Sequence, residues 1–470
     1  MIPLASLRST AIFLVPIFFV MLQNLGETPL LRSILILAGS ALAVLIVIVP
    51  LQILSWAFYT YRYEAGYLHI KSGVIFKKER SIKRERIQTV NISRGIVQRL
   101  LGLAGLQVET AGGGAESELS LTAVALEEAY NIKRGLEGPV SAAVAAGEEQ
   151  AATSAKKTGR EEIYRISASE LFLAGATSGG FFVLFSLIGL IFSQALPFIP
   201  DTFWEFVYDQ VTSTTAGTVV LVVLVLLIIS WLLSALAFMV QYANFTLHRE
   251  QDRLHISWGL IEQKQLALNI KRLQALVLHE GLLRQPFGRC ALVVEVAGGG
   301  SRDQNYITVL FPLLKKSEIP DFLARILPEY RLPPAFVPLP RRALRRYFLR
   351  AFLPALLLII PLQWVPYGWL SSLLLIPALF WGYSRYRAGG TCVDEKQLTL
   401  RFRFINRFQV LIRRNCLQAL QISANPFQRF RRLRTLTTWV LSSPSGKSFQ
   451  VTDIDIEEAG RLWSWYSPYF

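Results

Sequence analysis

The chain is poor in charge, in cysteine and in histidine. Only 17% of its 470 residues are charged, against about 25% in an average soluble domain, which excludes an ordinary soluble enzyme and a disordered protein. The three cysteines, Cys290, Cys392 and Cys416, form no CxxC pair, so we expect buried or unpaired thiols rather than disulfides or a zinc site. The four histidines accompany no HExxH, GxSxG or phosphate-loop motif. The sequence therefore predicts no catalytic residue, no metal and no cofactor.

Apolar residues make up 52% of the chain and are gathered in long uncharged runs. Runs of about 18 or more such residues predict membrane spans. The first run, residues 9–26, could also be interpreted as a signal peptide, but only Arg8 precedes it and no cleavage pattern follows. We interpret it instead as the first arm of a helical hairpin. The runs cover residues 9–26, 34–58, 171–200, 211–247 and 351–384.

These runs predict three transmembrane hairpins. The last is short for two full spans and is interrupted by Pro361, Pro366 and Gly368, so a re-entrant pair of helices fits it as well. Two full helices fit if the first begins near Arg345. The predicted hairpins cover residues 9–58, 171–247 and 345–384.

The net charge of +16 is spread unevenly around the hairpins. The turn at 196–216 holds Asp201, Glu205 and Asp209 and no Lys or Arg, whereas arginines flank the third hairpin at both ends. Basic residues close to spans stay in the cytoplasm, so we expect both termini and the large loops on the cytoplasmic side. The flanking arginines are Arg341, Arg342, Arg345, Arg346, Arg385 and Arg387.

The large loops contain an internal repeat. Residues 67–114 and 253–300 align without a gap at an offset of 186 residues, and both end in AGGG. A weaker third copy places Gln418 opposite Gln274, lacks the glycine and has Cys416 in place of the arginine. We expect paired residues to occupy the same place in each copy, with each glutamine one alternation beyond its arginine on one strand face. The pairs are Gly73 with Gly259, Arg86 with Arg272, Gln88 with Gln274, and Gly102 with Gly288.

Within each copy the pattern is that of a small β domain. Stretches such as GLQVET and ALVVEV predict strands, and an amphipathic helix ends each copy. The AGGG segments lack the GK[ST] of a phosphate loop and predict hairpin turns. The fold class is thus an α+β multi-domain membrane protein, in which each hairpin precedes a curved sheet or barrel closed by a helix. The β domains cover residues 61–138, 248–328 and 385–467, with linkers at 139–165 and 329–344.

Paired spans followed by G[VL]I, R[IL]Q, a glycine and a strand ending in AGGG resemble the YdbT-like family of bacterial PH-domain membrane proteins. The resemblance covers nearly the whole chain as three units. It implies three pleckstrin-homology-like (PH-like) domains on the cytoplasmic face of a bacterial inner membrane, and it brings no catalytic residue. Candidate partners under this resemblance are the membrane, a smaller paralogous PH-domain membrane protein, and another copy of the chain.

Basic residues gather in the first and third copies. They suit attraction to anionic lipid headgroups, at about 1 kcal/mol for each basic residue near the surface, or a solvated or partner-facing surface. Nucleic acid is not expected, because no aromatic-interleaved readout motif accompanies the charge. The third domain carries 14 Lys and Arg against 6 Asp and Glu, so it should dominate any lipid contact. The clusters are Lys77, Lys78, Arg80, Lys83, Arg84 and Arg86, and Arg401, Arg403, Arg407, Arg413, Arg414, Arg429, Arg431, Arg432 and Arg434.

Two functions from different classes fit these observations. We favour a non-enzymatic membrane protein that presents its PH-like domains to a protein partner or to anionic lipid, in maintenance of the cell envelope. The alternative is a lipid- or solute-translocating protein built on the six-helix bundle. A polar track through the spans would favour translocation, and the predicted spans hold almost no charge outside their ends.

Overall fold

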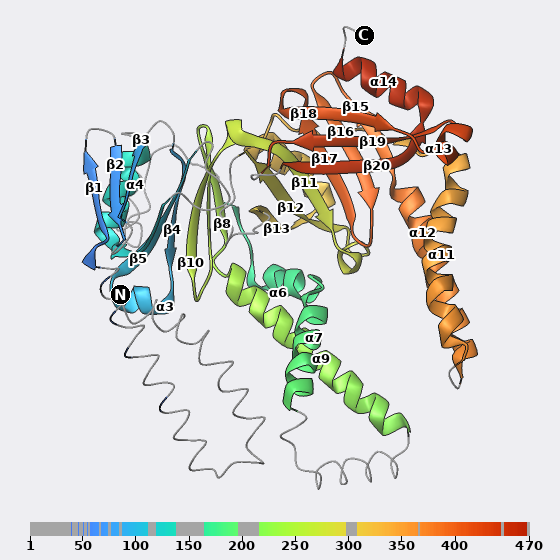
Figure 1. Cartoon of the computed structure of the whole chain (residues 1–470), viewed down its shortest axis with the longest axis horizontal. Coiled ribbons are helices and arrows are strands. Elements are labelled where there is room, and N and C mark those ends of the chain that lie inside the picture. Colours follow the sequence, from blue (N-terminus) through green and yellow to red (C-terminus); the bar gives the residue numbers. More distant parts are fainter. Residues whose placement is uncertain are drawn as a thin grey trace.

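The structure is a computed structural model in which a sheet-rich layer carries helical hairpins on one side (Figure 1). It describes residues 57–64, 67–73, 77–83, 87–110, 119–137, 164–195, 216–297, 308–364, 367–442 and 446–467, and a few single positions before residue 57. The first predicted hairpin lies almost entirely outside these residues, and so do Arg84 and Arg86 of the first basic cluster.

Each sequence copy supplies two sets of three antiparallel strands and a closing helix. The first copy comprises β1 (Thr60–Glu64), β2 (Tyr67–Ser72), β3 (Lys78–Lys83), β4 (Ile87–Arg94), α3 (Ile96–Leu100), β5 (Leu103–Thr110), β6 (Leu119–Ala125) and α4 (Leu126–Glu137). The second comprises β8 (Thr246–Glu250), β9 (Arg253–Trp258), β10 (Gln263–Asn269), β11 (Leu273–Glu280), η5 (Leu282–Arg284), β12 (Arg289–Val296), β13 (Thr308–Lys315) and α10 (Ile319–Ile326). The third comprises β15 (Gly390–Val393), β16 (Gln397–Arg403), β17 (Arg407–Arg413), β18 (Leu417–Ser423), α13 (Pro426–Phe430), β19 (Leu433–Val440), β20 (Lys447–Asp455) and α14 (Ile456–Tyr466).

Sheets of neighbouring copies are joined edge to edge. β4 pairs antiparallel with β10, and β11 pairs antiparallel with β17, so two sheets each run through two copies. We call these two strand pairings the first joint (β4 with β10) and the second joint (β11 with β17). A short strand from the preceding linker, β7 (Tyr164–Arg165) or β14 (Val337–Pro338), pairs with β8 or β15 and brings each sheet to seven strands. Gln263 faces Arg94 in the first joint, and the equivalent pair in the second joint is Arg407 with Glu280. The two joints therefore share one register. The expectation of a separate closed sheet in each copy needs this correction, because the edge strands are paired across copies.

The second and third copies also share apolar packing. Val277 and Val293 of the second copy pack in the core of the third, and Leu411 of the third packs in the core of the second. Among the described residues, the core of the first copy is built from that copy alone. The first joint thus depends on strand pairing, whereas the second combines strand pairing with a shared core.

The glutamine of the repeat motif marks a β-bulge in every copy. The register of β4, β11 and β18 against the next strand slips at Gln88, Gln274 and Gln418 respectively, so this residue is the extra one in each strand. Arg272 closes a 3-10 turn, η4 (Ile270–Arg272), before β11. The expectation that Arg272 and Gln274 share a strand face is therefore wrong, because the tight turn ends before the strand begins.

The glycine of the motif holds a left-handed turn after the short helix. Gly102 and Gly288 have φ values of 66° and 59°, and Arg432 stands at the equivalent place with φ 51°. The Arg432 amide donates to the carbonyl of Arg429 (N–O 3.1 Å), as the Gly288 amide donates to that of Gln285 (3.1 Å). The third copy has kept the turn without its glycine, which strains the backbone at Arg432.

We expect Arg432→Gly to stabilise the third domain by about 1 kcal/mol, because glycine adopts positive φ without the Cβ clash. Thermal melting of the full chain in detergent measures this change. Arg429→Gly is the matched control, since Arg429 lies within α13 and glycine there should destabilise by about 1 kcal/mol. A lower melting temperature for Arg432→Gly would contradict the assignment of strain.

The second hairpin comprises α6 (Ala168–Ala176), α7 (Gly180–Ala195) and α9 (Ala216–Tyr242). Within the described residues, only Val220–Tyr242 is by itself long and apolar enough to cross a membrane. α6 meets that test only together with the start of α7, to which it is bent by 62°. The hairpin predicted from sequence ended at residue 247, but α9 ends at Tyr242. The apolar run continues beyond the helix because β8 begins at Thr246 and contributes apolar residues to the domain core.

The third hairpin is shorter and lies beside the third copy (Figure 1). It comprises α11 (Leu344–Leu362), a 3-10 segment η8 (Gly368–Leu374) and α12 (Leu375–Ala388). Leucines along α11, such as Leu353 and Leu357, are exposed, as expected for a surface that meets lipid. Three complete hairpins remain a prediction.

Candidate functional site

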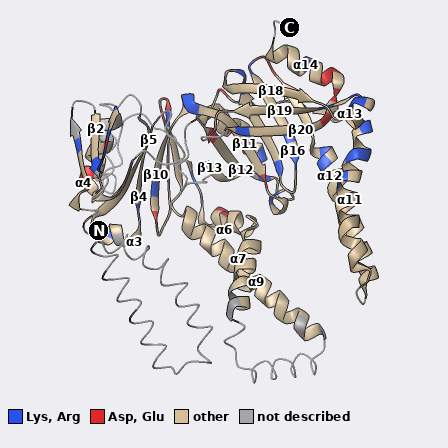
Figure 2. Cartoon of the chain, viewed as in Figure 1, with Lys and Arg blue, Asp and Glu red and all other residues tan. Residues whose placement is uncertain are grey.

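The third copy presents an exposed patch of aromatic and basic side chains on and directly after α13. Phe427 and Phe430 are 77% and 86% exposed, although phenylalanine is usually buried. We call this surface the α13 patch; it consists of Phe427, Arg429, Phe430, Arg431 and Arg432. Figure 2 shows that Lys and Arg gather on α13 and on the adjacent ends of α11 and α12, while the far ends of these helices carry none.

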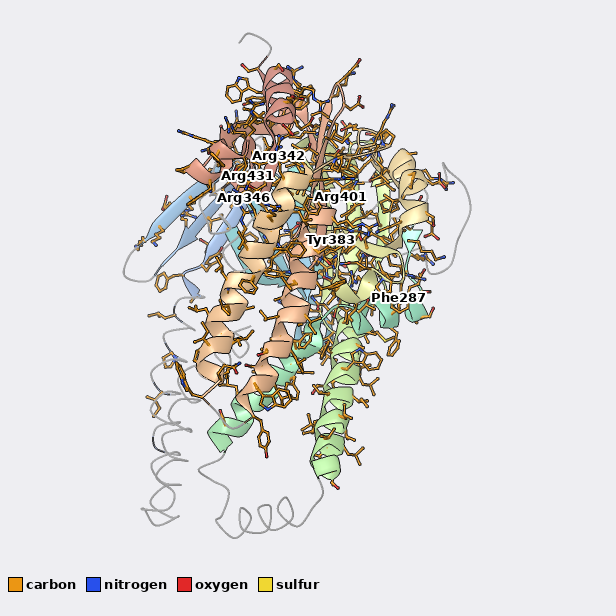
Figure 3. All side chains as sticks on the ribbon, turned by 90° about the vertical axis from the view of Figure 1, so that its right-hand side faces the viewer. Phe287, Arg342, Arg346, Tyr383, Arg401 and Arg431 are labelled. Atoms are coloured by element: carbon orange, nitrogen blue, oxygen red, sulfur yellow. The ribbon has the colours of Figure 1, made fainter. Side chains whose placement is uncertain are left out.

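The α13 patch is positioned by local capping and by α11. The Asn425 side chain accepts a hydrogen bond from the Gln428 amide (Oδ1–N 2.8 Å), and Pro426 occupies the first helical position. The Arg342 guanidinium donates to the Arg432 carbonyl (Nη2–O 3.3 Å), which brings the patch to the start of α11. Figure 3 shows Arg342, Arg346 and Arg431 together at that end.

A buried carboxylate fastens α11 to the third copy. Asp453 is fully buried in β20 and forms ion pairs with Arg346 (Nε–Oδ1 3.0 Å) and Arg350 (Nη1–Oδ2 2.6 Å). Gln428 of α13 donates to the same carboxylate (Nε2–Oδ1 2.8 Å), and Tyr347 donates to the Thr452 carbonyl (3.1 Å). One carboxylate therefore ties α13 to the first helix of the hairpin.

A buried arginine of the second copy, at the position equivalent to Gln428, attaches the second hairpin to its β domain. Arg284 of η5 donates to the carbonyls of Ala174 (Nη2–O 2.9 Å) and Pro312 (Nη1–O 3.1 Å) and to the hydroxyl of Thr177 (Nε–Oγ1 3.3 Å). Burial lowers the pKa of its guanidinium to about 10, so it remains a cation at neutral pH. Arg284 thus binds the Ala174 carbonyl and the Thr177 hydroxyl at the carboxyl end of α6, where a cation is favoured, and it links them to Pro312 of β13. Its equivalents in the other copies are Gln98 and Gln428.

Most of the other basic residues of the predicted third-copy cluster make contacts inside the fold, whereas Arg414 is exposed and lies over the Trp465 ring (5.4 Å). Arg407 pairs with Glu280 across the second joint, and Arg413 pairs with Glu329. Arg401 donates to the Ala388 carbonyl (Nε–O 2.9 Å). Of the nine predicted arginines, the structure leaves Arg429, Arg431 and Arg432 exposed together, and Arg434 is half-buried beside them.

The first-copy cluster lies along the edge strand β3. Lys77, Lys78, Arg80 and Lys83 are exposed there. The structure therefore does not bring the two basic clusters together within one chain, since they belong to opposite ends of the array (Figure 1).

The thiols do not form a reactive site. Cys290 and Cys416 are buried and Cys392 is half-buried, and all three are free. Burial raises the pKa of the Cys290 thiol to about 12, which keeps it protonated and unreactive. No group of three or more His, Cys, Asp or Glu side chains that could hold a metal ion occurs in the described part of the chain.

The comparisons with known proteins agree with this threefold architecture. A family model described as "Bacterial PH domain" matches residues 12–139, 190–330 and 348–470. The chain belongs to the bacterial PH-domain family. It is 34% identical to the UPF0699 transmembrane protein YdbT of Bacillus subtilis (strain 168) over 467 residues, 97% of this chain and 93% of that relative. No solved structure matches the chain significantly. The family resemblance predicted from sequence is confirmed, and the protein is a membrane protein with PH domains.

Sequence reasoning missed the two exposed phenylalanines and the buried carboxylate. The signal for the first was the stretch NPFQRFRR, where a helix start precedes aromatic and basic residues that alternate over one and a half turns. No comparable signal marked Asp453, because a lone acid in a strand usually faces water.

Proposed function

We propose that this membrane protein is a non-enzymatic binder of anionic phospholipid headgroups at the cytoplasmic face of the membrane. The observation that carries the proposal is the α13 patch, in which exposed Phe427 and Phe430 lie among Arg429, Arg431 and Arg432. Aromatic rings and arginines together suit the headgroup region, where one part of a side chain is apolar and another is wet or charged.

The position of the patch supports this choice of ligand. Arg342, which contacts the patch, precedes the exposed Leu349 by seven residues, or about 10 Å along a helix. This distance is slightly longer than the Debye length at physiological ionic strength, which is about 8 Å. Arg341 and Arg345 are exposed on the same stretch, so the local charge facing an anionic surface is several units positive.

We expect that replacing Arg429, Arg431, Arg432 and Arg434 with Gln weakens binding of phosphatidylglycerol by at least about tenfold. Each basic residue near the surface contributes about 1 kcal/mol to such binding. The measurement is phosphatidylglycerol retained by the full chain in mixed micelles, compared with phosphatidylcholine, by native mass spectrometry. Raised salt should weaken retention by the wild-type chain in the same way.

The matched control removes the same charge elsewhere, by replacing Lys77, Lys78, Arg80 and Lys83 with Gln. Its loss of retained phosphatidylglycerol should be much smaller. If the wild-type chain retains both lipids equally, the patch is a solvated or partner-facing surface and lipid binding is refuted.

The translocation alternative gains no support from the described helices. α7 and α9 contain no charged residue, and those of α11 and α12 lie within two turns of the cytoplasmic ends that we propose. A translocation path for a charged solute would need ionisable groups deeper in the bundle.

A further inference from the structure

The array of joined copies ends in two open strand edges. In the described part of the chain, β3 pairs only with β2, and β18 pairs only with β19. β3 is the equivalent of β10 and β17, while β18 is the equivalent of β4 and β11. The two open edges are therefore the two halves of the joint that the chain already forms twice.

We propose that β18 of one copy of this protein pairs antiparallel with β3 of a second copy, in the register of the internal joints. Lys78 then faces Ser423. The equivalent pair in the first joint is Lys264 with Ser93, so the same two residue types meet in both. This inference goes beyond lipid binding and does not depend on it.

The outward face of β18 is suited to such a partner. Ala275 and Val277 of β11 are buried by the second joint (0% and 6% exposed), whereas the equivalent Ala419 and Gln421 of β18 are exposed. β18 reads LQALQIS, without the lysine, proline or charge that usually protects an open edge. An unprotected edge is a template for strand addition.

The charges of β3 are compatible with pairing. β3 reads KERSIK, and charged edge strands often resist association. However, β10 carries Lys264 at the position of Lys78, and Lys264 is paired with Ser93 of β4 in the first joint. A lysine at this place therefore leaves the joint able to form.

The membrane-facing geometry is also compatible. The described second and third hairpins project from the same side of the array (Figure 1). Repeating the joint between chains should therefore keep every hairpin in one membrane. Because the two edges differ, the contact is head to tail, and it leads to a ring or an open row of copies.

Disulfide trapping between two separately tagged chains tests the proposal. One chain carries Lys78→Cys and the other Ser423→Cys, and both carry Cys392→Ala to remove the half-buried native thiol. Facing residues of antiparallel strands have Cα atoms about 4.5–5.5 Å apart, which suits a disulfide. After mild oxidation of membranes that contain both chains, we expect a disulfide-linked dimer carrying both tags.

Three controls make the result decisive. Ser93→Cys with Lys264→Cys in one chain should form the internal disulfide of the first joint, which reports a folded array. Gln421→Cys in place of Ser423→Cys is two residues off register and should give several-fold less mixed dimer. Either cysteine chain alone should give little dimer. If the internal disulfide forms and the mixed dimer does not, or if Ser423→Cys is linked only to a different protein, the proposal is overturned.

Discussion

Asp453→Asn is expected to lower the free energy of unfolding of the third domain by about 3–5 kcal/mol. The carboxylate of Asp453 is fully buried between Arg346 and Arg350. Removing its charge leaves two arginines facing each other without an anion, which is the costly way to break a buried ion pair. Thermal melting in detergent measures the loss, and proteolysis near α11 should rise, because the same group holds that helix.

Asparagine is chosen because it isolates the charge. Asp453 has φ 61°, and asparagine tolerates that left-handed conformation. Asp252→Asn is the control, since Asp252 pairs with Lys271 at 2.6 Å on an exposed surface, where ion pairs contribute little. Equal, small effects of the two substitutions would show that Asp453 does not fasten the hairpin.

Arg284→Met is expected to destabilise the second domain and its hairpin by about 2–5 kcal/mol. The substitution keeps an apolar stem but removes the guanidinium donor from the carbonyls of Ala174 and Pro312. A buried acceptor that loses its donor costs about 1–3 kcal/mol. Melting in detergent gives the total effect. Hydrogen exchange at α6 shows whether the helix has separated from the domain.

Arg284→Gln separates the stability of the second domain from the attachment of α6, because glutamine is the residue at this position in the other copies, Gln98 and Gln428. Gln98 accepts a hydrogen bond from the Gly95 amide (Oε1–N 2.8 Å), which glutamine should reproduce at Gly281. We expect this variant to keep the second domain folded while α6 loses protection from exchange. Unchanged protection of α6 would mean that Arg284 does not hold the helix.

The sequence predicts equivalent positions of the copies well and long-range pairing poorly. The repeat alignment identified Gln274 and Gly288 as equivalents of Gln88 and Gly102, and these pairs do occupy equivalent places, a β-bulge and a left-handed turn. The alignment did not predict the bulge or the turn themselves. The bend between α6 and α7 had a signal in the run Thr177–Gly180, TSGG, which breaks an otherwise apolar span. The joint between β4 and β10 had none, because a polar edge strand has the same pattern whether it is open or paired.

The candidate site shows the same division. Basic residues were predicted from composition, but their roles depend on the partners that the fold brings together. Arg407 meets Glu280 only because β17 lies beside β11, and that pairing is set by the joint. Arg429 and Arg431 remain exposed because α13 projects from the array.

The shared sheets also set an order of events during synthesis. β4 is made about 170 residues before β10, its partner across the first joint. At about 5–20 residues per second, the β4 edge waits roughly 10–30 s for that partner. The second hairpin is made within this interval, and if it inserts as predicted it holds both copies at one membrane. β10 is therefore synthesised close to β4, which favours pairing of these two strands over pairing of β4 with an edge strand of another protein.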